Sequence, residues 1–280
     1  MAQRKAMITG SEGFVGPYLR KELEKHDYEV IGIDLSGNPD FKCDITDRKS
    51  LERIILLNKP CHIFHLAGFS SPSQSFKQPE FCFKINVEGT RNLLESASKL
   101  NNRRVLIVSS AEVYGNPKYL PVDENHPLAP LSPYGFSRVE QEKLALGYPN
   151  TIIARSFNHT GPGQNSDFVI PSFIQQVDNT EDGGTIHVGN LEVIRDFSDV
   201  QDVVRAYRLL LEKGNLGEIY NIGSGIGYKL GEVLKRLIKK SGKNITVKID
   251  PEKYRKVDIY ELVCDNTKIK KLGAKFRKIF

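Results

Sequence analysis

Short, nearly continuous apolar runs alternate with longer amphipathic stretches along the first 155 residues. The apolar runs are typical of strands buried on both faces, and they lie at 4–10, 29–34, 41–44, 63–68, 104–109 and 151–155. The amphipathic stretches predict helices at 15–26, 47–58, 80–100 and 134–147. Repeated strand–helix units of this length predict an α/β fold with a parallel, doubly wound sheet. Ligands bind such sheets at the carboxyl ends of the strands.

The alternation becomes less regular after residue 155. Gly, Pro, Asn and Ser residues predict a loop at 157–168, and 190–200 is typical of a turn leading into a helix at 199–212. The remaining pattern predicts helices at 168–177 and 229–240, and strands at 185–188, 218–222 and 245–249. We therefore expect a main domain formed by 1–155 plus 198–222. A smaller C-terminal lobe would consist of 156–197 plus 223–280.

The net charge of +6 is concentrated toward the C-terminus, where 229–280 holds sixteen Lys and Arg residues against six Asp and Glu. Nucleic acid is one explanation of a basic segment. No basic motif interleaved with aromatic residues accompanies this one. An anionic small substrate, or a solvated basic surface, explains the charge better.

Features of secreted, membrane and metal-stabilised proteins are missing from the sequence. No apolar run approaches the length of a membrane span, and MAQRKAMITG lacks the apolar core of a secretory signal. The four cysteines are scattered without CxxC spacing and the six histidines are dispersed, so we expect reduced thiols and no bound metal. The sequence therefore predicts a cytoplasmic protein that binds neither membranes nor nucleic acid.

The first predicted strand runs into GSEGFVG, in which glycines recur at Gly10, Gly13 and Gly16. Glycines at such a point allow a tight turn and let the backbone approach a pyrophosphate, which the N-terminus of the next helix attracts. Asp34 ends the second strand, about 20 residues after the glycines, where a carboxylate suits the ribose hydroxyls of NAD and repels a 2′-phosphate. The combination predicts a dinucleotide site of the Rossmann type, so we expect 1–155 plus 198–222 to be a dinucleotide-binding domain and the smaller lobe to bind the substrate.

The stretch LSPYGFSR places Tyr134 four residues before Arg138. Ser132 and Pro133 are common residues at a helix start, and on a helix positions i and i+4 share one face. A fixed cation beside a phenol favours its ionised form, so the pair is a candidate proton donor. A surface Tyr beside a surface Arg is the plainer interpretation of this motif alone.

Six motifs occur in order along the chain: TGSEGFVG, HLAG, SSAEVYG, SPYGFSR, RSFNHTGPGQ and VGNLEVIRDFSDV. Together they resemble the extended short-chain dehydrogenase/reductase family. Within it they are most similar to the nucleotide-sugar branch that includes GDP-mannose 4,6-dehydratase and GDP-6-deoxy-4-keto-mannose reductase. The resemblance covers nearly the whole chain. Family members usually continue into a further helix, so the C-terminal lobe is expected to be short.

The resemblance implies a catalytic group of four residues. Tyr134 would be the acid/base, and Ser110 would hold the substrate carbonyl. Arg138 occupies a position that is normally Lys, which bonds the nicotinamide ribose. Arg keeps the charge, but its planar fork differs from an ammonium, so ribose positioning is an open question. Glu112 matches a glutamate that takes part in water elimination in the dehydratase and also occurs in some reductases; a solvent-facing residue is the alternative.

The resemblance also implies cofactor contacts beyond the glycines. Asp44 matches a residue near the adenine, and the loop after the fourth strand matches one that passes under the cofactor. Asn86 matches the family's helix asparagine, whose role is as much structural as catalytic. The complete expected set is Gly10, Gly13, Phe14, Val15, Gly16, Asp34, Asp44, Ile45, Leu66, Ala67, Gly68, Tyr134 and Arg138.

Four residues in the second half match substrate contacts of the nucleotide-sugar branch. Asn158 and Arg195 would bind the diphosphate, the latter through charge-assisted hydrogen bonds. Arg255 matches a second phosphate-binding arginine, and Asp258 would bond the ribose of the nucleotide. A surface ion pair is the alternative for each arginine.

The motif GPGQ favours a reductase within the branch. The implied reaction is NAD(P)H-dependent reduction of the C4 keto group of GDP-4-keto-6-deoxy-mannose, with NAD(H) expected and NADP(H) left open. A 4,6-dehydratase or a 4-epimerase that recycles its NAD is the first alternative. A non-catalytic NAD-binding protein is the second, because Arg138 replaces the usual lysine. Family members commonly form dimers through two helices, here near 80–100 and 134–147.

Overall fold

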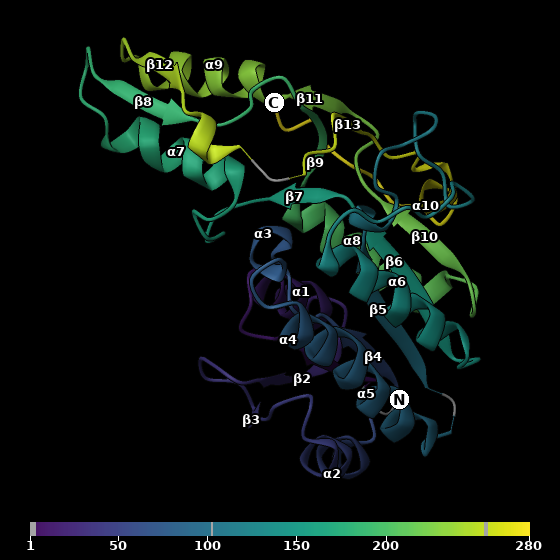
Figure 1. Ribbon diagram of the computed structural model, residues 1–280. Helices are drawn as coiled ribbons and strands as arrows, with labels where there is room; N and C mark the ends of the chain where they lie inside the picture. The colour runs from purple at the N-terminus through teal and green to yellow at the C-terminus, as the bar shows by residue number, and fades with distance from the viewer. Residues whose placement is uncertain (1–3, 102, 255–256) are drawn as a thin grey trace.

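The computed structural model describes residues 4–101, 103–254 and 257–280, and its largest element is a seven-stranded sheet (Figure 1). The strand order is β10-β6-β5-β4-β1-β2-β3, and every pairing in it is parallel. This confirms the predicted doubly wound sheet. The strands are β1 (Arg4–Thr9), β2 (Tyr28–Asp34), β3 (Phe41–Lys42), β4 (His62–His65), β5 (Arg104–Ser110), β6 (Thr151–Ser156) and β10 (Ile219–Ile222).

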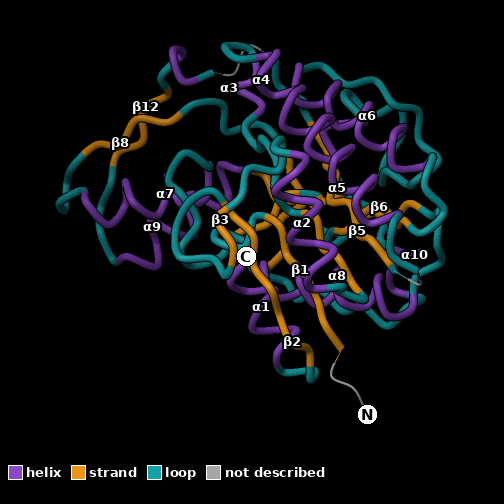
Figure 2. The backbone as a smooth tube through the Cα atoms, turned by 90° about the horizontal axis from the view of Figure 1, so that it is seen from below, coloured by secondary structure: helices purple, strands orange, loops and turns teal. Residues whose placement is uncertain are grey.

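Helices cover both faces of this sheet (Figure 2). One face packs against α1 (Gly16–Glu24) and α8 (Val200–Lys213), and the other against α2 (Arg48–Asn58), α5 (Gly89–Ser98) and α6 (Pro133–Leu146). Within β1, Ala6 and Ile8 join the first core while Met7 joins the second. Both faces of each central strand are buried, which is why these strands are apolar at nearly every position.

The predicted helix over 80–100 is not one regular helix. It consists of α4 (Pro79–Phe83), a π-helical turn η1 (Lys84–Glu88) and α5, preceded by the short α3 (Pro72–Ser75). The prediction of a single α-helix was wrong at the π-turn, because its hydrogen bonds to the fifth residue leave no mark on the apolar pattern. Such turns occur often at functional sites, and this one carries Asn86.

The remaining strands form two smaller sheets. In the first, β9 (Ile194–Asp199) pairs with β7 (Asn158–Thr160), β11 (Gly227–Lys229) and β13 (Glu261–Leu262). The expected loop at 157–168 and the expected turn at 190–200 were therefore wrong where β7 and β9 lie. In the second, β8 (Thr185–Val188) pairs with β12 (Thr246–Ile249), and both lie with α7 (Val169–Asn179) and α9 (Leu230–Ser241) to one side of the main sheet (Figure 1).

The C-terminal segment returns to the main sheet. Residues Ile269 of α10 (Thr267–Lys270) and Ala274 belong to the apolar core beside α1 and α8. The prediction placed all of 223–280 in the substrate lobe, and these two side chains instead pack against the larger sheet. None of the helices in the described part of the chain is both long and apolar enough to cross a membrane.

Candidate active site

The carboxyl ends of the central strands meet at one edge of the main sheet. Thr9 of β1 is the register partner of Ile33 in β2 and of His65 in β4. Ser110, at the end of β5, is the partner of Ser156 in β6. The expected cofactor residues follow these strand ends, so the sheet gathers them along the edge where ligands bind in this architecture.

Two glycines of the GSEGFVG loop occupy places that no side chain fits. Gly10 has φ +75°, and a Cβ there would lie 2.7 Å from the backbone N of Ala67. A Cβ on Gly16, the first residue of α1, would collide with the carbonyl oxygen of Ser11. Gly13 N donates to Gly10 O at 3.3 Å, which closes the turn. The loop thus exposes bare backbone at the N-terminus of a helix, where a pyrophosphate is stabilised.

The same loop contacts the segment that follows β6. The ring of Phe14 stacks on His159 with centroids 6.1 Å apart, and Tyr18 Oη donates to Pro162 O at 2.7 Å. Val15 immediately precedes α1 and packs against the core on that side. The expected cofactor loop and the expected sugar loop are therefore in direct contact.

Asp34 ends β2 and caps the turn beside the glycine loop. Its Oδ2 accepts a hydrogen bond from Glu12 N at 2.9 Å, and its Oδ1 accepts from Leu35 N at 2.7 Å and Ser36 N at 3.2 Å. Three backbone donors hold the carboxylate in one orientation. It lies at the end of the strand next to β1, as expected for a residue that reads the adenosine ribose.

Asp44 and Ile45 lie beyond β3, on the side toward α5. Asp44 Oδ1 accepts from both N and Oγ1 of Thr46, each at 2.8 Å. Ile45 is buried against Gly89, where a Cβ would lie 2.5 Å from Ile45 Cδ1. The turn is thus held by local bonds on one side and by close helix packing on the other.

The segment Leu66–Gly68 leaves β4 next to the glycine loop. The backbone N atoms of Leu66 and Ala67 both donate to Thr9 O, at 3.0 and 2.9 Å. A Cβ on Gly68 would lie 2.9 Å from Nη2 of Arg138. Glycine is needed here because the guanidinium occupies the space that a side chain would fill.

Tyr134 is positioned by the first turn of α6. Ser132 caps the helix, since its Oγ accepts from Gly135 N at 3.0 Å, and Tyr134 N donates to Ser75 Oγ at 3.1 Å. The guanidinium carbon of Arg138 lies 5.1 Å from the centroid of the Tyr134 ring. Both side chains are nearly buried, at 6% and 5% exposure, so the motif is not a pair of surface residues.

The buried Arg138 guanidinium binds neutral oxygens. Nη1 donates to Val108 O at 3.0 Å and to Gln141 Oε1 at 2.8 Å, and Nη2 donates to Phe69 O at 3.2 Å. Among the described residues, Nε has no hydrogen-bond partner. A buried cation without a carboxylate among these acceptors favours negative charge nearby, and an unused buried donor favours a ligand acceptor.

Gln141, Thr90 and His65 complete this network, and the sequence analysis did not identify them. Gln141 Nε2 donates to Thr90 Oγ1 at 2.7 Å, and His65 Nε2 lies 2.9 Å from the same oxygen. His65 Nδ1 lies 2.7 Å from Thr9 Oγ1. Burial, and then the charge of Arg138, lower the pKa of His65 to about 3, so its ring is neutral. Gln141 could have been found from its position three residues after Arg138 on the same helix face.

Asn86 uses its side chain entirely within the protein. Its Oδ1 accepts from Phe69 N at 2.8 Å, and its Nδ2 donates to Ser137 Oγ at 2.8 Å. These bonds tie the π-turn η1 to α6 and to the loop under Arg138. In this structure its contacts are those of a structural residue.

Ser110 and Glu112 lie against the first turn of α6. Ser110 Oγ accepts from Glu112 N at 3.2 Å at the start of the 3₁₀ turn η2 (Ala111–Val113). A Cβ on Gly135 would lie 2.9 Å from Glu112 O, which shows how closely η2 and α6 approach. Ser110 and Tyr134 are thus brought to the same edge from two different elements.

A buried ion pair anchors α6 to the sheet. Arg155 of β6 donates to Glu142 of α6 through Nε at 3.1 Å and Nη2 at 2.7 Å, and both side chains are below 5% exposed. Ser109 Oγ donates to the same carboxylate at 2.5 Å. Such a paired and fully bonded charge fixes the orientation of the helix that carries Tyr134.

The expected substrate residues lie around β9. Arg195 is 6% exposed, and its Nη2 donates to Asp258 Oδ1 at 2.8 Å while Nη1 donates to Ile194 O at 2.9 Å. Asn158 is exposed on β7, the neighbouring strand. Arg255 lies outside the described residues. The structure therefore brings Arg195 and Asp258 together, with the carboxylate already on the guanidinium.

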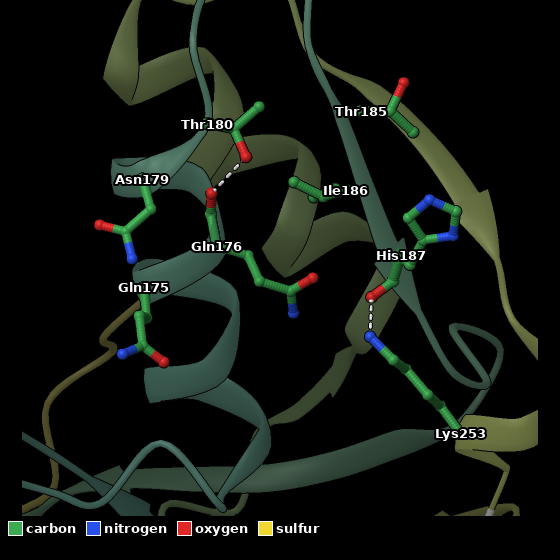
Figure 3. A pocket seen from close by; sticks show the side chains of 8 residues that line it. All are labelled: Gln175, Gln176, Asn179, Thr180, Thr185, Ile186, His187 and Lys253. Carbon is green, nitrogen blue, oxygen red and sulfur yellow. Dashed lines mark hydrogen bonds between the residues drawn. The ribbon is translucent and has the colours of Figure 1, made fainter.

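A polar hollow of about 320 Å³ lies elsewhere, between α7, β8 and Lys253 (Figure 3). Lys253 Nζ donates to His187 O at 2.7 Å, and the hollow is lined largely by amide and hydroxyl side chains. None of the expected site residues lines it. Within the described ranges, no three His, Cys, Asp or Glu residues gather in a way that could hold a metal ion.

Comparison with known proteins identifies the family. The GDP-mannose 4,6 dehydratase family model matches residues 7–277. GDP-6-deoxy-D-mannose reductase of Pseudomonas aeruginosa is 31% identical, over 92% of this chain and 86% of its own. A putative UDP-glucose 4-epimerase of Methanocaldococcus jannaschii is 32% identical, over 96% and 92%. The crystal structure of RMD from Pseudomonas aeruginosa complexed with NADPH superposes with a TM-score of 0.88 at 29% identity, covering 99% of this chain and 94% of that one. The chain belongs to the GDP-mannose 4,6 dehydratase family of extended short-chain dehydrogenases/reductases, a group of NAD(P)-dependent nucleotide-sugar enzymes.

Proposed function

We propose that this chain uses NAD(P)H to reduce the C4 keto group of GDP-4-keto-6-deoxy-mannose to a GDP-6-deoxyhexose of the GDP-rhamnose type. The observation that carries the proposal is the buried Arg138 guanidinium, 5.1 Å from the Tyr134 ring, with Nε unused among the described residues. The 31% identity to GDP-6-deoxy-D-mannose reductase supports the choice of sugar.

The residues at the sheet edge suit a dinucleotide. Gly10 and Gly16 leave backbone free of Cβ atoms at the positive end of α1, which suits a pyrophosphate. Asp34 would accept from the adenosine ribose, and Arg138 would donate to the nicotinamide ribose. When bound, NAD(P)H supplies the hydride; the chain supplies binding, orientation and the proton.

Proton delivery falls to Tyr134 and Ser110. The Tyr134 phenol would donate its proton to the oxygen at C4 as negative charge develops there. Ser110 Oγ already accepts from Glu112 N, so its own O–H remains to hold the substrate oxygen. The Arg138 cation would stabilise the phenolate left behind, because opposite charges attract strongly where water is scarce.

The nucleotide-sugar would lie between the sheet edge and the lobe formed by 156–197 and most of 223–280, with 1–155 plus 198–222 holding the cofactor. Asn158, Arg195 and Arg255 would bind the diphosphate, and Asp258 the ribose. For Arg195 this requires that its bond to Asp258 Oδ1, now 2.8 Å, give way to a phosphate oxygen. A diphosphate carries more charge than one carboxylate, which favours the exchange.

A 4,6-dehydratase or a 4-epimerase is the main alternative. The 32% identity to a putative UDP-glucose 4-epimerase supports the epimerase. Both reactions return the hydride, so they consume no reduced cofactor. A non-catalytic NAD-binding protein is the remaining alternative, motivated by Arg138 alone.

The deciding experiment follows loss of reduced nicotinamide absorbance with GDP-4-keto-6-deoxy-mannose and NADH or NADPH. We expect stoichiometric oxidation with formation of a 6-deoxyhexose. Tyr134→Phe should lower kcat by about a hundredfold or more, since general acid catalysis contributes about 10²–10⁴. The exposed Tyr119→Phe is the matched control. Absence of oxidation with either cofactor, combined with a keto-sugar product from GDP-mannose and NAD, would identify a dehydratase instead.

We also propose a cytoplasmic homodimer that pairs through the helices near 80–100 and 134–147. Phe81 of α4 and Phe136 of α6 are 51% and 52% exposed, which leaves apolar surface on these helices. Cys43, Cys61, Cys82 and Cys264 are all free thiols, as suits a reducing compartment. Light scattering of the native chain against a Phe81→Ser, Phe136→Ser variant tests the dimer.

A further inference from the structure

The guanidinium of Arg138 is held through its two terminal nitrogens, Nη1 and Nη2. A guanidinium carries five N–H donors in a rigid plane. Three of them are accounted for by Val108 O, Gln141 Oε1 and Phe69 O. These three bonds leave Nε–H and one Nη2–H. In the region that the structure describes, Nε is buried without a partner.

The orientation of the Gln141 amide is imposed by its neighbours. Thr90 Oγ1 donates its single proton to Asn86 O at 2.7 Å, so toward Gln141 it can only accept. The amide nitrogen of Gln141 must therefore face Thr90, at 2.7 Å, and the amide oxygen must face Arg138, at 2.8 Å. Gln141 is fully buried, so no water competes for either bond.

The hydrogen bonds of His65 are consistent with this orientation of the Gln141 amide. Because Thr90 Oγ1 accepts on this side, His65 Nε2 carries the proton and Nδ1 accepts from Thr9 Oγ1 at 2.7 Å. The hydroxyls of Thr9 and Thr90 thus have defined donor and acceptor roles. The chain of bonds runs from β1 and β4 through α5 to Gln141, and it ends at Nη1 of Arg138.

We propose that Gln141 is a positioning residue for the cofactor: by holding Nη1 of Arg138 it fixes the rotation of the guanidinium beside which the nicotinamide ribose would bind. An arginine at this place needs such a restraint, because its fork must be correctly rotated to present two donors, whereas an ammonium donates in any rotation. The inference rests on the role proposed for Arg138 in cofactor binding, and not on the identity of the sugar.

A double-mutant cycle on NADH binding, measured by fluorescence titration without sugar, tests the inference. Gln141→Met keeps the size of the side chain and removes the acceptor. With Arg138 present, we expect the Kd for NADH to rise about tenfold, the order expected for a lost hydrogen bond to a charged group. In the Arg138→Lys background, which has no Nη1, the same substitution should change Kd by less than about twofold. Equal losses in both backgrounds, or no loss with Arg138, would overturn the proposal.

Two further variants separate positioning from folding. Gln141→Glu retains an oxygen toward Nη1 but loses the donor to Thr90, so the Thr90 hydroxyl must turn its proton from Asn86 O toward the carboxylate. With that rearrangement the variant should bind NADH within about threefold of the native chain, since the charge-assisted bond to Nη1 is preserved. If it binds as poorly as Gln141→Met while its circular dichroism is native, the inference is wrong. Ser96→Ala is the matched control, because Ser96 is buried on α5 and its Oγ donates to Asn92 O within that helix. Since sugar is absent from these titrations, failure of C4 reduction would not affect their outcome.

Discussion

At the scale of single residues, the site contains polar side chains with two kinds of hydrogen bonding. Some have several hydrogen-bond partners within the protein, and others have an atom without one. Asp34 accepts from three backbone N–H groups, which favour one orientation of its carboxylate. Arg138 is buried, and its Nε is unpartnered among the described residues. The first arrangement would place a carboxylate at the adenosine ribose, and the second would place a cation at the nicotinamide ribose. The two riboses of one dinucleotide would thus be bound by side chains of opposite charge.

Asp34 should make the chain prefer NADH over NADPH, although the crystallised RMD of Pseudomonas aeruginosa holds NADPH. A fixed carboxylate repels the 2′-phosphate, and a repulsion of about 1.4 kcal/mol already gives about a tenfold difference in Kd. Asp34→Asn should reduce the difference between the Kd values for NADH and NADPH, each measured by titration. Asp27→Asn makes the same charge change at the amino end of β2 and should leave the preference intact. Tighter binding of NADPH to the native chain would contradict this prediction.

At the scale of elements, α6 determines the site because it carries Tyr134, Arg138 and Gln141 on successive turns, with Glu142 directly after Gln141. Ser132 caps its N-terminus, and Arg155 holds Glu142 to β6. The π-turn η1 then brings Asn86 to Ser137 of the same helix. Small movements of α6 would displace the proton donor and the cation together.

Loss of the Ser132 cap should affect both stability and turnover. Ser132→Ala leaves Gly135 N without its acceptor and should lower the free energy of unfolding by about 1 kcal/mol in urea titrations. We expect kcat to fall as well, because the frayed turn carries Tyr134. Asp47→Ala removes the cap of α2, whose Oδ1 accepts from Ser50 N at 3.2 Å. Asp47→Ala should lower the free energy of unfolding by a similar amount and leave kcat unchanged. An equal loss of kcat in both variants would show that the fall in kcat of Ser132→Ala does not come from the first turn of α6.

At the scale of the whole molecule, two neutral histidines, the buried His65 and the partly buried His62, link stability to pH. Burial, and then the charge of Arg138, lower the pKa of His65 to about 3. Burial, and then the charge of Arg104, lower the pKa of His62 to about 4, although Glu212 acts in the opposite direction. In the unfolded chain both rings titrate near about 6.5. The unfolded state therefore takes up protons first, so the stability present above about pH 6.5 is lost as the pH falls toward the folded values.

Each such histidine should contribute a slope of about 1.4 kcal/mol per pH unit between about pH 6 and pH 4. His65→Gln removes one titrating ring, so its free energy of unfolding should fall less steeply with decreasing pH by about that amount. Urea titrations across this range measure the slope. His187→Gln, at an exposed ring, should behave as the native chain does. An unchanged slope in His65→Gln would mean that His65 is protonated in the folded state.

The sequence by itself determined the parallel sheet, because strands buried on both faces must be apolar at almost every position and helices between them must be amphipathic. It also determined the glycine loop, Asp34 and the shared face of Tyr134 and Arg138, since these follow from local geometry along one strand, turn or helix.

Only the tertiary structure decided that 194–199 is a strand: Arg195, Asp196 and Ser198 are buried there, and polar residues mask the apolar pattern. The Asp196 carboxylate is satisfied by Ser224, Gly225 and Cys264, which are distant in sequence. The bonds that join Gln141 to Thr90, and Thr90 to His65, also connect residues distant in sequence. Hydrogen bonds between residues from three elements depend on how those elements pack, and no spacing along a chain records that.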